Sequence, residues 1–239
     1  MSKALMIQGT GSHVGKSLLV AALCRIFRRK GLRVAPFKAQ NMALNAHVTT
    51  DGKEMARAQA TQAEAAGIPP GVEMNPVLLK ATSHTSAQVI LMGKAVGNMG
   101  VMEYRAFKAR AWEVICEAYR KLSSQFDLIV IEGAGSPAEI NLKSDEIVNM
   151  RVAGMTDARV LLAGDIDRGG IFAAFVGTME LLTPEERARV AGFIINKFRG
   201  DAGLLKGGID FLEARLGKKV FGIVPYLEGL DLPEEDGVA

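Results

Sequence analysis

Short apolar runs alternate with stretches of helical periodicity along the whole chain. Short apolar runs predict strands over 5–8, 33–37, 88–92, 128–132, 160–163, 192–195 and 220–224. Spacings of three and four residues predict helices over 16–30, 53–66, 103–123, 145–153, 171–182, 184–190 and 209–216. Most of the strands are apolar throughout, which is typical of a parallel sheet covered on both faces. The expected fold class is therefore α/β, a doubly wound and mainly parallel sheet with ligands at the carboxyl ends of its strands.

A glycine-rich segment, Gly-Thr-Gly-Ser-His-Val-Gly-Lys-Ser over 9–17, joins the first expected strand to the first expected helix. Amides of such a loop and the helix N-terminus bind phosphate, the lysine reaches the outer phosphates and the serine hydroxyl ligates Mg²⁺. The commonest pattern has a glycine five positions before Gly15, where Thr10 stands, so this loop is one residue longer and starts at Gly9. The expected nucleotide contacts are Gly11, Ser12, His13, Val14, Gly15, Lys16, Ser17 and Leu18.

Composition fits an intracellular α/β protein. The 239 residues carry 29 Lys and Arg against 26 Asp and Glu, a net charge of +3, with no long block of like charge. We therefore expect no nucleic-acid partner, and no apolar run is long enough to predict a membrane span. The first strand begins within a few residues of Met1, which leaves no room for a signal peptide, so a cytoplasmic location is expected.

The two cysteines, Cys24 and Cys116, both fall inside expected helices and lack a CxxC spacing. Residues 1–227 are expected to form a single P-loop domain. The acidic, proline-containing end over 228–239 is expected to be the start of a linker to a domain that this chain does not contain.

Two carboxylates are candidate magnesium ligands. Glu132 closes the apolar run over 128–131, and an acid at the end of a strand next to a phosphate loop is more often a metal ligand than a turn cap. Asp51, in Thr-Thr-Asp-Gly-Lys, is either a second magnesium carboxylate or the N-cap of the following helix, and the spacing favours neither.

Polar residues also follow other expected strands. Asp165 and Arg168 come directly after the strand over 160–163, beside paired glycines, and suit a site for an acidic substrate; the alternative is a turn in which Asp167 caps the next helix. Asn196 ends a later strand and could match the donor and acceptor of the adenine edge, although asparagine is also common in turns. Lys38, with Gln40, Asn41 and Asn45, follows the second strand and is expected to face the same crevice as the loop.

Five segments together resemble the N-terminal ATP-binding domain of the cobyric acid synthase family, which belongs with dethiobiotin synthetase and cobyrinic acid a,c-diamide synthase. The segments are Gly9–Ser17, 35–45 (Ala-Pro-Phe-Lys-Ala-Gln-Asn-Met-Ala-Leu-Asn), 74–80 (Met-Asn-Pro-Val-Leu-Leu-Lys), 132–142 (Glu-Gly-Ala-Gly-Ser-Pro-Ala-Glu-Ile-Asn-Leu) and 165–170 (Asp-Ile-Asp-Arg-Gly-Gly). The loop is widely shared among nucleotide-binding proteins. The segments over 35–45, 132–142 and 165–170 are close to signatures of this one family, and the resemblance covers essentially the whole chain.

The resemblance implies an ATP-dependent amidoligase. ATP would phosphorylate a peripheral carboxylate of a corrinoid, adenosylcobyrinic acid a,c-diamide, and ammonia would displace the phosphate to give an amide. Lys16, Lys38 and Arg168 would then be catalytic, and Ser17, Asp51 and Glu132 would hold Mg²⁺. The expected substrate residues are Gln40, Asn41, Ser136, Glu139, Asn141 and Asp165.

One departure from the family concerns the ammonia source. The family carries a glutaminase domain with a cysteine nucleophile at a strand-to-helix elbow, and neither cysteine of this chain has that context. A missing glutaminase domain or a separate subunit is therefore an expected partner, and a homodimer is possible as well.

The alternative functions are those of another carboxylate-activating ligase of the same fold, cobyrinic acid a,c-diamide synthase or dethiobiotin synthetase, and of a partitioning-type ATPase switch. The switch is disfavoured because Thr10, Gly11 and Ser12 offer no lysine early in the loop.

Overall fold

The computed structural model describes residues 2–229, and Met1 and residues 230–239 lie outside the described part. The expected linker start over 228–239 therefore falls almost wholly outside it. The chain divides into two compact units. Among the described residues, the first unit comprises residues 2–4 and 17–132, and the second comprises 5–16 and 133–229.

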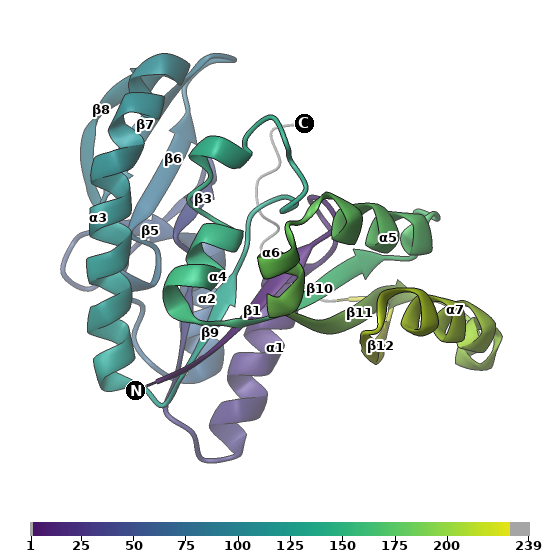
Figure 1. Cartoon of the computed structure of the whole chain (residues 1–239). Coiled ribbons are helices and arrows are strands. Elements are labelled where there is room, and N and C mark those ends of the chain that lie inside the picture. The colour runs from purple at the N-terminus through teal and green to yellow at the C-terminus, as the bar shows by residue number, and fades with distance from the viewer. Residues whose placement is uncertain (1, 230–239) are drawn as a thin grey trace. The chain divides into compact units, whose positions relative to one another are not determined.

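Six strands form a sheet in the order β12-β11-β10-β1-β9-β2 (Figure 1). Their bounds are β1 Lys3–Gly9, β2 Val34–Phe37, β9 Leu128–Glu132, β10 Arg159–Asp165, β11 Val190–Phe198 and β12 Lys219–Pro225. β1 pairs with β10, β10 with β11, β11 with β12 and β2 with β9, each in parallel. The expectation of a mainly parallel α/β sheet is confirmed. It follows that Gly9, Glu132, Asp165 and Asn196 all lie at or near carboxyl ends of strands.

In the first unit, α2 (Arg57–Ala66) packs on β2, and α3 (Val101–Gln125) packs on β9 and on the short 3₁₀ turn η1 (Val72–Met74). α1 (Lys16–Arg29) belongs to this unit from Ser17 on. α3 buries Ala111, Ile115, Ala118 and Leu122 along one face, as its periodicity predicts. The Tyr119 ring meets the ring of Phe37 from β2 edge-on, with centroids 5.5 Å apart.

The first unit also holds a second sheet that the sequence analysis did not anticipate. β3 (Gln40–Met42), β6 (Val77–Ala81), β7 (Ser86–Leu91) and β8 (Lys94–Gly100) lie in that order, with β3 parallel to β6 and the other pairs antiparallel. The expected strand over 88–92 belongs here and not to the six-stranded sheet. β4 (Ala46–Val48) pairs with β5 (Glu54–Ala56), so the expected helix over 53–66 begins only at Arg57.

In the second unit, β1, β10, β11 and β12 are accompanied by α4 (Met150–Thr156), α5 (Ile171–Leu181), α6 (Pro184–Arg189) and α7 (Lys206–Leu216), with 3₁₀ turns η2 (Lys143–Asp145) and η3 (Ala202–Leu205). Phe175 of α5 packs on Phe193 of β11, with ring centroids 4.9 Å apart. The expected helix over 145–153 is wrong in its first half. There the Glu146 carboxylate accepts hydrogen bonds from the main-chain amides of Val148, Asn149 and Arg151, and the helix starts at Met150.

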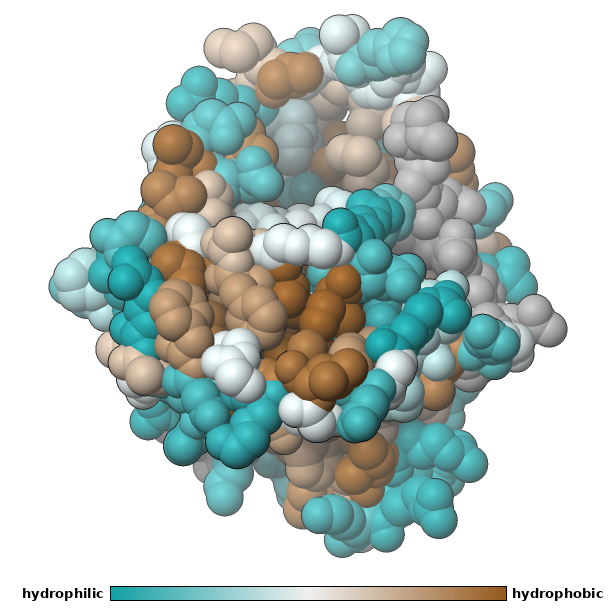
Figure 2. Space-filling model, turned by 90° about the vertical axis from the view of Figure 1, so that its right-hand side faces the viewer, coloured by the Kyte–Doolittle hydropathy of each residue, from teal (hydrophilic) through white to brown (hydrophobic). Residues whose placement is uncertain are grey.

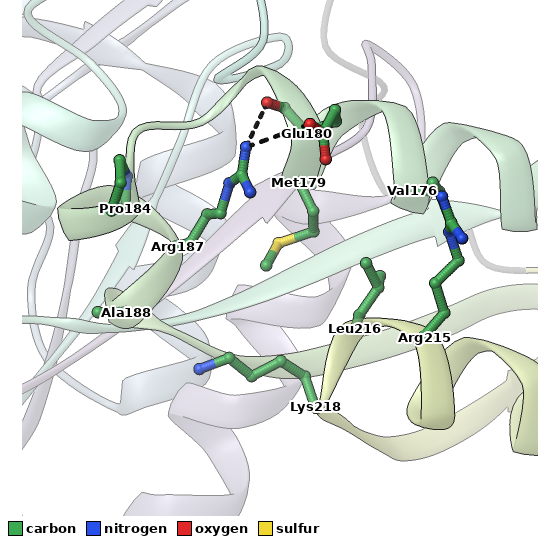
Figure 3. Close-up of a pocket in the computed structure, with 9 residues that line it drawn as sticks. All are labelled: Val176, Met179, Glu180, Pro184, Arg187, Ala188, Arg215, Leu216 and Lys218. Atoms are coloured by element: carbon green, nitrogen blue, oxygen red, sulfur yellow. Dashed lines mark hydrogen bonds and ion pairs between the residues drawn. The ribbon is translucent and has the colours of Figure 1, made fainter.

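A cavity of about 480 Å³ lies between α5, α6 and α7 of the second unit (Figure 3). Its floor is apolar, with Met179 and Leu216, and Arg187 donates to the main-chain oxygen of Glu180 at its rim. Ala188 and Lys218 line it just before β11 and β12 begin, so the cavity lies at the amino ends of these strands. The candidate site residues of this unit follow carboxyl ends, and the cavity is therefore separate from them.

The side of the molecule that carries α5, α7 and β12 exposes apolar side chains, which gather near its centre in Figure 2. Phe211 of α7 and Phe221 of β12 are 57% and 63% exposed. β12 is also an edge strand of the six-stranded sheet. Within residues 2–229, no helix combines the length and the apolar character that crossing a membrane requires.

Candidate nucleotide and metal site

In the second unit, the loop between β1 and α1 closes around the side chain of Lys16. The Lys16 ammonium donates hydrogen bonds to the main-chain oxygens of Gly11 (2.9 Å) and Gly135 (3.2 Å), and the residue is only 6% exposed. His13 and Gly15 have positive φ angles of 59° and 93°, which turn the chain back toward the start of α1. The loop therefore has the form of a phosphate cradle with its lysine in place.

The end of β11 fastens this loop from the outside. The Asn196 side-chain amide donates to the main-chain oxygen of Val14 (2.8 Å), and the Lys197 ammonium donates to that of His13 (2.7 Å). A Cβ at Gly15 would lie 2.3 Å from the Asn196 amide nitrogen, so only glycine fits there. Asn196 was expected to contact adenine. One hydrogen of its side-chain amide is used in the bond to Val14, and its side-chain oxygen and second amide hydrogen remain for such a contact.

Asp165 is bound into the same cluster of the second unit. Its carboxylate accepts from Lys197 (2.8 Å) and from the main-chain amide of Asp167 (2.9 Å), and the Arg168 guanidinium lies 3.8 Å away. Arg168 itself is 69% exposed. Asp165 therefore stabilises the turn at Asp167 and holds Lys197, which in turn contacts the phosphate loop. Of Asp165 and Arg168, only Arg168 is open to solvent.

The segment after Glu132 is anchored by a residue that the sequence analysis missed. Asn149 donates to the main-chain oxygen of Ala134 (2.7 Å) and accepts from its amide (3.1 Å). A Cβ at Gly133 would lie 2.4 Å from the Asn149 side-chain oxygen, which explains the glycine. Ser136 is buried and accepts from the amide of Ala138. Of the other expected substrate residues in this segment, Glu139 and Asn141 are exposed.

In the first unit, Glu132 is the centre of a buried polar cluster. Its Oε1 accepts from the Lys38 ammonium (2.7 Å) and from the Ser17 hydroxyl (2.9 Å). Its Oε2 accepts from the side-chain amides of Gln62 (2.5 Å) and Gln59 (3.2 Å). Glu132 and Lys38 are 1% and 3% exposed, so the ion pair and its hydrogen bonds offset the desolvation of two charges. The structure brings together three expected residues and two that the sequence analysis missed.

The other polar residues after β2 serve this cluster or its surroundings. The Asn41 side-chain amide donates to the Gln59 oxygen (3.1 Å), and Asn41 is buried. The Tyr104 hydroxyl donates to the Gln40 side-chain oxygen (2.5 Å). Burial raises the pKa of Tyr104, which keeps that hydroxyl a donor. Asn41 therefore contacts the amide that supports Glu132, while Gln40 is fixed from α3.

Asp51 lies in the turn between β4 and β5. It pairs with the Lys53 ammonium (2.7 Å) and accepts from the Thr49 hydroxyl (2.5 Å), and these two hydrogen bonds hold the pKa of Asp51 below its usual value. Because β5 follows the turn, Asp51 is not the N-cap of a helix. Its side chain is 57% exposed, and its role as a metal ligand stays a prediction.

The Ser17 and Glu132 oxygens fit a magnesium ion, because Mg²⁺ prefers one or two protein oxygen ligands and completes its shell with water and phosphate. Across the described residues, no group of three or more His, Cys, Asp or Glu side chains is arranged to hold a metal by itself. A magnesium ion held by these two oxygens would take its remaining ligands from water and phosphate.

Comparison with solved structures identifies the fold. The chain is similar to the signal recognition particle receptor FtsY from Elizabethkingia anophelis in complex with GDP, with a TM-score of 0.54 and 17% identity over 95% of this chain and 58% of that chain. It is also similar to the signal recognition particle 54 kDa protein from Aeropyrum pernix K1, with a TM-score of 0.51 and 16% identity over 95% of this chain and 42% of that one. At these identities the likeness concerns the fold alone.

Comparison with curated sequences gives much closer relatives. The chain is 63% identical over 239 residues to a cobyric acid synthase from Moorella thermoacetica, and 60% identical to one from Pelotomaculum thermopropionicum. In both cases the match covers 100% of this chain and 46% of the relative, so the chain spans about half the length of the curated relatives it matches.

The family model described as the CobQ/CobB/MinD/ParA nucleotide binding domain matches residues 5–237. That range includes the loop around Lys16, the fastening residue Asn196 and the Glu132 cluster. The chain therefore belongs to the CobQ/CobB/MinD/ParA nucleotide-binding domain family.

Proposed function

We propose that this chain is the ATP-dependent synthetase part of a cobyric acid synthase, which converts peripheral carboxylates of adenosylcobyrinic acid a,c-diamide into amides. The observation that carries the proposal is the buried Glu132 cluster with Lys38 and Ser17, next in sequence to Lys16 of the phosphate loop. The 63% identity to a cobyric acid synthase supports the choice of substrate over that of dethiobiotin synthetase or a partitioning ATPase.

The chemistry follows from these groups. A substrate carboxylate oxygen attacks the γ-phosphorus of ATP, the bond to the bridging oxygen breaks and ADP leaves. Ammonia then adds to the acyl carbon, phosphate leaves, and the nitrogen loses a proton to give the amide. The carboxylate is already a nucleophile and needs no base, so the protein's contribution is positioning and charge stabilisation.

Each residue has a role in this scheme. Lys16 stabilises negative charge on the transferred phosphoryl group, and Lys38 and Arg168 stabilise the acyl phosphate. Ser17, Glu132 and Asp51 would hold Mg²⁺, which supplies further charge neutralisation when bound. Gln40, Asn41, Ser136, Glu139, Asn141 and Asp165 complete the proposed corrinoid side.

Ammonia is proposed to come from a glutaminase domain or subunit outside this chain. Cys24 and Cys116 lie inside α1 and α3, and burial raises the pKa of the Cys24 thiol to about 12. A cysteine nucleophile must be a thiolate, so Cys24 is unsuited to attack glutamine.

The experiment supplies the chain with ATP, Mg²⁺, an ammonium salt and the diamide corrinoid, and follows the product by mass spectrometry. We expect the stepwise mass change of successive amidations with ammonium, and none when glutamine replaces it. Lys16→Ala should abolish turnover and keep the fold, whereas Lys30→Ala, an exposed lysine just after α1, should behave like the wild type. Nucleotide binding without any amidation would refute the assignment of the corrinoid.

A further inference from the structure

The two oxygens of Glu132 have separate sets of partners. Oε1 faces the Ser17 hydroxyl and the Lys38 ammonium, and Oε2 faces the amides of Gln62 and Gln59. Gln62 also donates to the main-chain oxygen of Ser17 (3.3 Å). Gln62 thus contacts both Ser17 and Glu132, the two residues that would hold the metal, and it does so through atoms other than the Ser17 hydroxyl and the Glu132 Oε1 that contact each other.

Both glutamines are in an unusual place for their residue type. They are 0% and 1% exposed and lie on the buried face of α2, where the other buried residues are Ala60, Ala63 and Ala66. Burying an amide is costly unless it is hydrogen-bonded, and an apolar side chain would pack there without that cost. Their presence is explained by what their amides do at Glu132.

The two amides prevent a competing arrangement of the cluster. The terminal torsion of a glutamate side chain is soft, so rotation of the carboxylate would let either oxygen face the Lys38 ammonium. Because Gln59 and Gln62 occupy Oε2, Lys38 is confined to Oε1, on the side of Ser17. Asn41 fixes Gln59 in turn by donating to its oxygen, which leaves the Gln59 amide nitrogen directed at Glu132.

We infer that Gln59 and Gln62 are positioning residues that orient Glu132 for the divalent metal of the bound nucleotide. This inference rests on the proposed function, because it takes the metal–nucleotide complex as the ligand. Groups that orient a metal ligand from behind typically contribute ten- to a hundredfold to metal affinity. Gln59 and Gln62 are fully buried and act through their hydrogen bonds to Glu132.

The experiment compares Gln59→Met and Gln62→Met with the wild-type chain. Methionine keeps the length of the side chain and removes the amide donors. The control is Gln8→Met, another fully buried glutamine, whose amide nitrogen donates to the sulfurs of Met6 and Met150. Binding of Mn²⁺ is titrated by electron paramagnetic resonance in the presence of a non-hydrolysable ATP analogue, and affinity for the analogue is also measured without metal.

We expect Mn²⁺ affinity to fall about tenfold or more in both α2 variants, with unchanged metal-free nucleotide affinity, and no change in Gln8→Met. A variant that merely unfolds would lose its affinity for Mn²⁺ and its affinity for the metal-free analogue together. In that case the inference is tested on the other α2 variant. Equal Mn²⁺ affinity in all folded variants overturns the inference, as does a wild type that binds the analogue but takes up no Mn²⁺ in its presence. If the wild type binds Mn²⁺ as expected but does not amidate the corrinoid, the proposed function fails and the positioning role stands.

Discussion

The side-chain amide of Asn196 donates a hydrogen bond to the main-chain oxygen of Val14, 2.8 Å away, and so joins the end of β11 to the phosphate loop. The contact depends on the residue next to Val14. Gly15 has a φ of 93°, and its missing Cβ leaves the space that the Asn196 amide occupies. The phosphate loop and the end of β11 are therefore packed together through Asn196 and Gly15.

Gly15→Ala should displace Asn196 and distort the loop. Because a new Cβ would lie 2.3 Å from the Asn196 nitrogen and the positive φ disfavours alanine, we expect nucleotide affinity to fall by about tenfold or more. Titration with a fluorescent ATP analogue measures the change. Gly154→Ala, where a Cβ meets nothing within 4 Å, is the matched control and should bind like the wild type. Unchanged affinity in Gly15→Ala would show that the fastening is dispensable.

Lys38→Met should destabilise the fold strongly. It removes the Lys38 ammonium from the buried Glu132 carboxylate, and breaking a buried ion pair from one side costs about 3 kcal/mol or more. Chemical denaturation measures the free energy of unfolding. The double variant Lys38→Met/Glu132→Gln removes both charges and should regain most of the loss. A double variant no more stable than Lys38→Met would mean that the charge on Glu132 is not the cause.

Gln8→Met should stabilise the protein. Gln8 is fully buried in β1, its amide meets only sulfur atoms, and its oxygen has no hydrogen-bond partner among residues 2–229. Removing one unsatisfied buried acceptor should raise the free energy of unfolding by about 1 kcal/mol. Denaturant melts of the variant and wild type test this, and a lower midpoint for the variant would show that the amide has a role beyond packing.

Cys24 should resist alkylation in the native protein. Burial raises the pKa of its thiol to about 12, so at pH 8 roughly one molecule in ten thousand carries the reactive thiolate. Iodoacetamide labelling followed by peptide mass spectrometry should modify Cys24 slowly in the native chain and rapidly after denaturation. Native labelling at the denatured rate would mean that α1 opens readily around this residue.

The strands of the six-stranded sheet could be predicted from the sequence, because each contains a short apolar run of its own. The run over 128–131 closed by Glu132 is a buried strand ending at the metal candidate, as expected. The second sheet could not be predicted in this way. Gln40-Asn41-Met42 has no apolar run, and becomes β3 only because it pairs with β6, more than thirty residues later. Residues 54–56 likewise leave the expected helix because they pair with β4.

The candidate site divides along the same line. Lys16, Ser17, Lys38 and Glu132 could be recognised because loop and strand-end positions mark them. Gln59 and Gln62 could not, since helical periodicity indicates which face is buried and not which polar groups meet there. The only available signal was two glutamines, three residues apart, among the alanines of α2. Asn149 was missed for a similar reason, because its partner Ala134 is fifteen residues away.

The side chain of Asn75 joins main-chain groups of three separate segments of the first unit. It donates to the main-chain oxygens of Lys38 and Val77 and accepts from the amide of Ala56, while Met74 accepts from the amide of Lys38. Lys38, the first residue after β2, is thereby fixed through both its main-chain amide and its main-chain oxygen. The turn of the β7–β8 hairpin lies beside this contact, since the Met92 amide donates to the main-chain oxygen of Pro76 and the Glu54 amide donates to that of Gly93. A change of length in that hairpin is therefore a change next to the residue that holds Lys38, and it should be felt at the ion pair with Glu132.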